Sequence, residues 1–367
     1  MRDLIRANLG LLLAGVATFV LLGAGQSLLG PALPAFSRSF GVTTGQAGIL
    51  VSALWVGSAC GIALMYFQGA QVTPRHALVL VSLGAAIMAT MAAWGLMVVG
   101  AVVLGTGSGI SAAVFNPRIL RAFEDRGPSM LSLLNASFGV GAIIAPLVFV
   151  AVGNDPHWSF GLLAAAAACL WLLTGGAGQV GTTEARVAKV AFRPRWLILG
   201  FGTLAIGLEA TLIGLGPTAL IRAGESETRA AELLSAFFIA FLAARIVLIF
   251  TAHLIPSFAL FIAAMVGTCL LAWAATVFDP AWPFIGIGAF ASLFFPSFYV
   301  TATRLMGDDL RVPPTIIASG LVGGITFPFL IAPGLVGMGE RGLFALVAGL
   351  TLVSAIMALA SLRWMRT

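Results

Sequence analysis

The sequence predicts an all-α membrane protein with twelve transmembrane helices in two parallel six-helix halves that repeat one another. Hydrophobic residues make up 60% of the 367 positions and charged residues only 9%, against about 25% charged in a typical soluble domain. Apolar stretches long enough to cross a bilayer recur along the whole chain, separated by short polar clusters. Motifs of the first half return in the second, and no segment remains for a soluble domain.

The expected spans follow the apolar stretches in chain order. They are 8–31, 46–68, 76–94, 96–117, 130–152, 158–177, 196–221, 231–250, 257–277, 282–305, 314–335 and 343–362. The first also resembles a signal peptide, because basic residues precede its apolar core, but eleven further spans favour a retained helix. We therefore expect an N-terminal bundle at 1–177, a cytoplasmic linker at 178–195 and a C-terminal bundle at 196–367.

Basic residues set the orientation, because short cytoplasmic loops collect Lys and Arg. With both termini in the cytoplasm, all but four of the 19 basic residues lie on the cytoplasmic side; the exceptions are Arg38, Arg222, Arg229 and Arg341. The net charge of +6 is thus a topology signal, and its scatter over loops argues against nucleic-acid binding. The Arg-rich, Lys-poor composition favours a bacterial inner membrane, and we expect a monomer there.

Internal repeats support the division into halves. Residues 52–78 begin SALWVGSACG and end PRHAL, while residues 235–260 begin SAFFIAFLAA and end PSFAL. The Gly-to-Pro spacing at 141–146 recurs at 323–328, so these matches share an offset of 182 to 183 residues. An offset near half the chain length predicts two six-helix halves in the same orientation.

Glu209 lies in the middle of the seventh span, in the segment LAIGLEATLIGLG at 204–216. A carboxylate near the bilayer midplane is costly, which favours a functional role. Burial favours its neutral form and an aqueous cavity favours its charged form, so alternating access would load and release a proton. Two alternatives stay open: hydrogen bonding to an uncharged solute, and a structural protonated carboxyl. The repeat offset pairs Glu209 with Gln26, which favours one shared cavity.

Polar and aromatic side chains within the spans are further candidates for solute contacts. Amides suit hydroxyl or carbonyl groups, and a phenol in an apolar span usually finds a polar partner. Amides also join helices, and aromatic side chains also serve in packing. The candidates are Gln26, Asn116, Asn135, Tyr299, Trp55 and Phe298. Candidate gating residues near the cytoplasmic ends of the fourth and eighth spans are Arg118, Arg121 and Arg245.

Several segments together carry a family resemblance. They are GPALPAFSRSFGVTTGQAGILVSALWVG, FNPRIL, LLNASFGVGAIIAPL, GLEATLIG, AARIVL, ASLFFPSFYVTATRLMG and GGITFPFLIAPGL. With these segments the sequence resembles the major facilitator superfamily, and within it the fucose permease and glucose/galactose transporter branch. The resemblance covers nearly the whole chain. It implies the major facilitator fold, with a binding site at the membrane midplane between the two halves.

The sequence departs from this branch where proton-coupled sugar members carry acids. The resemblance implies one acid in the first helix and one in the fourth, but those places hold Gly30 and the run from Gly109 to Ala113. The loop from Gly69 to Arg75 also lacks the Asp of the superfamily motif. The proton coupling and the charge lock of those relatives therefore do not carry over at these positions.

These features predict a secondary active transporter that moves a small organic solute, sugar-like or amphipathic, by alternating access with proton coupling through Glu209. The alternatives are a proton-independent facilitator, a multidrug-type exporter, or a non-transporting membrane sensor or scaffold. Sparse charge in the spans argues against a strongly charged solute. No catalytic constellation is present, the three cysteines lie in separate spans, and GTGSG at 105–109 lacks the context of a phosphate loop. We therefore expect no enzyme activity, cofactor or metal.

Overall fold

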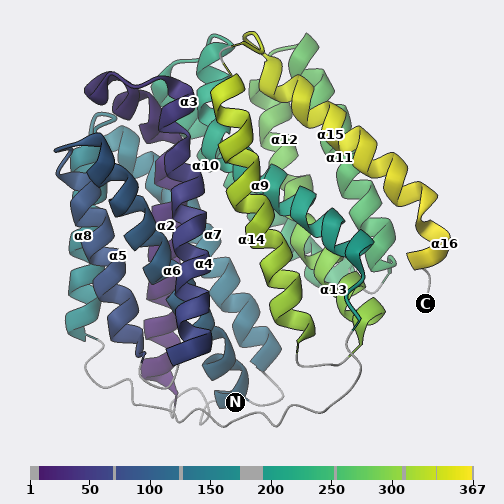
Figure 1. Cartoon of the computed structure of the whole chain (residues 1–367), viewed down its shortest axis with the longest axis horizontal. Coiled ribbons are helices and arrows are strands. Elements are labelled where there is room, and N and C mark those ends of the chain that lie inside the picture. Colours follow the sequence, from purple (N-terminus) through teal and green to yellow (C-terminus); the bar gives the residue numbers. More distant parts are fainter. Residues whose placement is uncertain are drawn as a thin grey trace. The chain divides into compact units, whose positions relative to one another are not determined.

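Apolar segments of this length form helices because, in a bilayer, a helix satisfies its own backbone hydrogen bonds. The computed structural model describes residues 8–68, 72–123, 127–173, 193–251, 254–307, 311–335 and 337–365. Every regular element in these ranges is a helix (Figure 1). Eleven helical stretches are long and apolar enough to cross a membrane, and one shorter apolar helix, Pro74–Ala89, accompanies them. The predicted all-α membrane fold is confirmed.

The chain forms two compact units, Met1–Val42 with Ile49–Glu184, and Thr43–Gly48 with Ala185–Thr367. The first holds α2 (Leu9–Phe40), α4 (Ile49–Gln68), α5 (Pro74–Ala89), α6 (Trp94–Ala122), α7 (Gly127–Ala151) and α8 (Pro156–Leu173). The second holds α3 (Thr44–Ala47), α9 (Trp196–Arg222), α10 (Glu227–Thr251), α11 (Ser257–Val277), α12 (Ala281–Ala291), α13 (Phe294–Met306), α14 (Val312–Ile331), η2 (Ala332–Gly334), α15 (Gly342–Ala360) and α16 (Leu362–Met365). The predicted linker at 178–195 lies outside the described residues up to position 192.

Helices pair in the same pattern inside each unit. In the first unit α2 packs on α7, α4 on α6 and α5 on α8; in the second, α9 packs on α14, α10 on α12 and α11 on α15. Small residues permit the closest approaches. A methyl group at Gly141 would collide with the carbonyl oxygen of Val20, and one at Gly323 with that of Thr203. The sequence repeat thus corresponds to a repeat in helix packing.

The first span is longer than predicted, because α2 continues past residue 31 to Phe40. Pro31 and Pro34 lie inside the helix, and membrane helices tolerate proline because neighbouring groups satisfy the freed carbonyls. The helix ends where Gly41 adopts a left-handed backbone with φ of 62°, which glycine reaches at little cost.

The tenth span, predicted as one helix at 282–305, is broken into α12 and α13 at Ser292 and Leu293. The Leu293 N–H bonds to the carbonyl of Phe290, three residues back, which tightens the chain at this point. Pro296 explains the break, because it has no N–H to donate to the carbonyl of Ser292 four residues earlier. The break therefore leaves the Ser292 carbonyl in need of another donor.

Candidate functional site

Glu209 lies in the middle of α9 and is partly buried. Its carboxyl oxygen Oε2 is shielded from solvent and has no hydrogen-bond partner among the described residues. The other acidic residues that the structure describes lie in turns or within the first two turns of α10: Asp155, Glu225, Glu227, Glu232, Asp279 and Glu340. Glu209 is therefore set apart from them by its position deep in a span.

Arg245 lies on α10, inside the candidate membrane span Glu227–Leu248, and is partly buried. Its Nε donates a hydrogen bond to the carbonyl of Ser292 at 3.3 Å. This arginine thus supplies the donor that Pro296 cannot supply at the break between α12 and α13. Its guanidinium carbon lies 4.6 Å from the centroid of the Phe241 ring, one turn earlier on α10, in a cation–π contact.

The geometry of α9 and α10 places Glu209 and Arg245 at neighbouring depths on two packed helices. The two helices pack together and are joined by residues 223–226, so they run antiparallel. At about 1.5 Å per residue, Glu209 lies about 21 Å and Arg245 about 28 Å from this turn. Helical side chains lean toward the N-terminus of their own helix, so Arg245 leans toward the turn and Glu209 away from it. The long arginine side chain shortens the remaining separation.

The two charged groups interact electrostatically but form no direct ion pair. The outer two nitrogens of Arg245, Nη1 and Nη2, have no partner among the described residues, and neither is sealed from solvent. The second unit therefore holds two groups within spans that can each bind a further partner: the carboxyl group of Glu209 and the Nη1 and Nη2 donors of Arg245.

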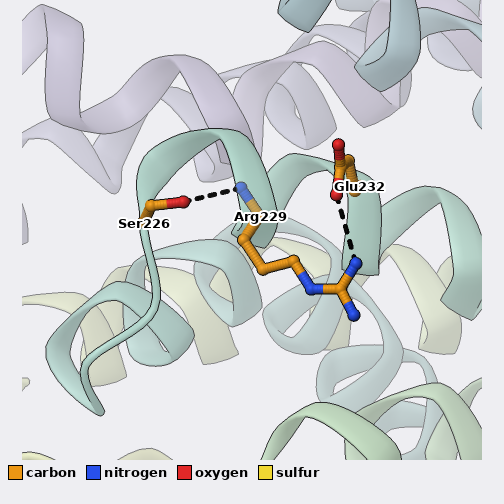
Figure 2. Close-up of polar contacts among 3 residues, drawn as sticks. All are labelled: Ser226, Arg229 and Glu232. Carbon is orange, nitrogen blue, oxygen red and sulfur yellow. Dashed lines mark hydrogen bonds and ion pairs between the residues drawn. The ribbon is translucent and has the colours of Figure 1, made fainter.

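A second charged pair on α10 has a different character. The Ser226 Oγ accepts a hydrogen bond from the backbone N–H of Arg229 at 3.1 Å, and Arg229 Nη1 donates to Glu232 Oε2 at 3.2 Å (Figure 2). The side chains of Arg229 and Glu232 are 50% and 41% exposed. This is a direct surface ion pair in the first turns of the helix.

The predicted residues of the first unit occupy varied environments. Gln26 and Trp55 are partly buried in α2 and α4. Asn116 in α6 is also partly buried, and its Oδ1 has no hydrogen-bond partner among the described residues. Asn135 is exposed on α7, and its Nδ2 donates to the carbonyl of Leu131 at 3.0 Å. The side-chain carbonyl oxygen of Asn116 is thus an acceptor that is both shielded from solvent and without a partner among the described residues.

The remaining predicted residues divide between packing and surface positions. Phe298 is fully buried, and its ring lies against Gly202 of α9, where a methyl group would collide with it. Tyr299 is partly exposed, with its ring centroid 5.4 Å from that of Phe295. Arg118 is partly buried and Arg121 is exposed, both in the last turns of α6. Phe298 therefore contributes to the core of the second unit.

Sequence reasoning identified Glu209 and Arg245 separately but missed their association and the role of Ser292. The available signal was Pro296, which lies four residues after Ser292 and removes one backbone donor. Among the described residues, no group of three or more His, Cys, Asp or Glu side chains is placed to hold a metal ion.

Comparisons with known proteins agree with the helical membrane fold. The family model of the Major Facilitator Superfamily matches residues 15–312. A D-xylose–proton symporter has a TM-score of 0.76 at 13% identity, with 95% of this chain and 97% of that chain covered. A nucleoside transporter scores 0.75 at 15% identity, covering 96% and 99%, and the E. coli fucose:proton symporter scores 0.62 at 18%, covering 97% and 98%. No curated protein sequence matches the chain.

Proposed function

The chain belongs to the Major Facilitator Superfamily and is a secondary transporter of small solutes, and we propose that it couples solute movement to protons through Glu209. The proposed solute is a small organic molecule, sugar-like or amphipathic, moved by alternating access. The proposed location is a bacterial inner membrane with both termini in the cytoplasm, where the chain acts as a monomer.

The observation that carries this proposal is the state of the Glu209 carboxyl group. Its shielded Oε2 lacks a partner among the described residues, and it forms no direct ion pair, so a proton can bind without displacing an existing contact. In general, a low-dielectric environment disfavours a charged carboxylate, whereas a neighbouring cation or access to water favours it. These opposing influences suit a group that changes its protonation as its access to water alternates.

The predicted solute contacts keep their proposed roles with different support. Asn116 has the strongest, because its buried Oδ1 has no partner among the described residues and can accept a hydrogen bond from a solute. Gln26, Asn135, Tyr299 and Trp55 offer further polar or aromatic surface. Phe298, buried in the second unit, acts through packing against Gly202. The proposed gating cations at the end of α6 are Arg118 and Arg121. Two relatives named above as sugar–proton symporters make a sugar-like solute a reasonable first choice.

The test is proton movement in proteoliposomes that contain a pH-sensitive dye, with sugars, sugar acids, polyols and amphipathic drugs added in turn. Wild type and Glu209→Gln are compared with Glu232→Gln, which removes an acid from the surface of α10. We expect at least one solute to drive proton flux in wild type and in Glu232→Gln but not in Glu209→Gln. Equal, solute-driven proton flux in all three proteins would contradict the proposal.

A proton-independent facilitator or multidrug-type exporter is the second candidate. It is favoured by the absence of acids at Gly30 and at Gly109 to Ala113, where the branch that the sequence resembles carries them. Its signature in the same experiment is solute flux without a dye response, unchanged in Glu209→Gln. A sensor or scaffold would instead bind solute without flux.

A further inference from the structure

Arg245 is the feature that the proposed proton coupling does not use. Its Nε bond to Ser292 and its cation–π contact with Phe241 hold the guanidinium group in place. These contacts leave Nη1 and Nη2 as two parallel donors with no partner among the described residues. Such a fixed fork matches the two oxygens of a carboxylate, which it binds with two charge-assisted hydrogen bonds.

Few other ionisable side chains lie on the helices that pack against Glu209 and its helix α9. Among the helices packed against α9, only α10 and α13 carry ionisable side chains. Those other than Arg245 are Glu227, Arg229, Glu232, Tyr299 and Arg304. The two acids and Arg229 lie in the first turns of α10 and Arg304 lies in the last turn of α13, and the charge acting on Glu209 is that of Arg245.

Charge balance couples protonation of Glu209 to the binding of an anion at Arg245. With Glu209 ionised, the pair is neutral and Arg245 is compensated. When Glu209 takes up a proton, the span retains an uncompensated arginine, which is costly inside a membrane. An anionic group bound to Nη1 and Nη2 removes that cost. By thermodynamic linkage, each of the two ligands then strengthens the binding of the other.

We infer that Arg245 is the specificity-determining residue of the transporter and that the coupled solute is a small organic anion held through its carboxylate. This inference rests on the proposed proton coupling and names its substrate class. One proton enters on Glu209 with one carboxylate on Arg245, so the loaded site carries no more charge than the empty one. The sugar-like solute of the proposal becomes a sugar acid or hydroxy acid. The sequence argument for an uncharged solute treated Arg245 as a gating residue at the end of its span; in the structure it lies inside the span Glu227–Leu248, three residues before the end.

The inference also separates two roles of Arg245, one structural and one in binding. Removing the side chain frees the Ser292 carbonyl as well as the carboxylate site, so Arg245→Gln alone confounds them. Pro296→Ala restores a backbone N–H that can reach Ser292. In the double variant Arg245→Gln/Pro296→Ala, the carbonyl regains a donor while the carboxylate fork stays absent.

The experiment uses the full chain in proteoliposomes with an internal pH dye and matched solute pairs, gluconate against glucose and lactate against propane-1,2-diol. The proteins are wild type, Arg245→Lys, Arg245→Gln/Pro296→Ala, Pro296→Ala alone and Arg304→Gln, which removes an exposed arginine of α13. We expect a carboxylate to drive proton uptake about tenfold or more faster than its neutral partner in wild type, Pro296→Ala and Arg304→Gln. Arg245→Lys keeps part of the effect, and the double variant loses it.

Two outcomes overturn the inference: neutral partners that drive proton uptake as well as the acids do, or a folded double variant that transports carboxylates like wild type. Exchange of radiolabelled gluconate and lactate separates this failure from failure of the proposed function. If the exchange depends on Arg245 but no solute moves protons, the anion site stands and the proton coupling fails. If a neutral solute drives protons in wild type and not in Glu209→Gln, the coupling stands and the anion site fails.

Discussion

The two ends of α10 carry two charge pairs with opposite properties. Near its start, Arg229 and Glu232 touch directly at 3.2 Å and are half exposed (Figure 2). Toward its other end, Arg245 interacts with Glu209 of α9 without direct contact, while its Nε is held by Ser292. The first pair is joined by a direct contact and is exposed to solvent. The second has no direct contact between its members and lies within the spans.

This difference indicates which of the two pairs can respond to a bound proton or solute. A surface ion pair contributes little free energy, because water and salt screen both partners. A separated pair inside a membrane segment responds strongly to any added charge, because the surrounding medium screens little. Contact distance alone would rank the two pairs in the wrong order for function.

The largest expected effect comes from removing one acid at each end. Glu209→Gln should lower solute-driven proton flux by about a hundredfold or more, because no other described acid lies deep in a span. Glu232→Gln should leave it unchanged, since Glu232 lies at the exposed end of the helix. Initial rates of dye response in proteoliposomes measure both. Loss of coupling in Glu232→Gln but not in Glu209→Gln would reverse the comparison.

The next effect concerns pH. Carboxylate binding at Arg245 is expected to need protonated Glu209, so the apparent KM for a carboxylate solute should rise as pH increases, by up to about tenfold per unit. The solute itself stays ionised between about pH 5.5 and 8, so it does not obscure the trend. Exchange of labelled solute across this range gives the KM, and Glu209→Gln should flatten the profile. A pH-independent KM in wild type would contradict the linkage.

A smaller effect is expected on stability. Arg245→Gln should destabilise the protein by about 1 kcal/mol more in the wild-type background than in Pro296→Ala, because the restored N–H replaces the lost donor to Ser292. A double-mutant cycle of unfolding free energies in detergent measures this difference. Strict additivity would show that the Nε bond to Ser292 contributes nothing.

The smallest effect is expected at the surface pair. Arg229→Ala should change the unfolding free energy by at most about 0.5 kcal/mol, as exposed pairs one turn apart usually do. It should leave transport unaltered, and high salt should erase even the stability change. Reduced transport in this variant would show that exposure is a poor guide to function in this helix.

Hydropathy predicted most of the fold, because the positions of membrane-spanning helices follow directly from the apolar stretches of the sequence. It placed Glu209 in the centre of a span for the same reason. It failed at α2, which was predicted to end at residue 31 but continues through Pro31 and Pro34 to Phe40. It also could not assign helix faces, since the spans are apolar all round, so the burial of Phe298 and the exposure of Asn135 were not foreseen. The meeting of Arg245 with Ser292 depends on helix packing that no local pattern encodes.

The donor exchange at the α12–α13 break has an evolutionary consequence. Pro296 removes one backbone amide, and Arg245 of a different helix supplies the replacement. The two positions therefore form an epistatic pair: proline at 296 makes arginine at 245 harder to lose, and any other residue at 296 relaxes that constraint. In descendants of this chain, substitutions at position 245 are expected to follow loss of the proline. A change in the transported solute would then require an earlier substitution at position 296, in another helix, that itself leaves transport unaltered.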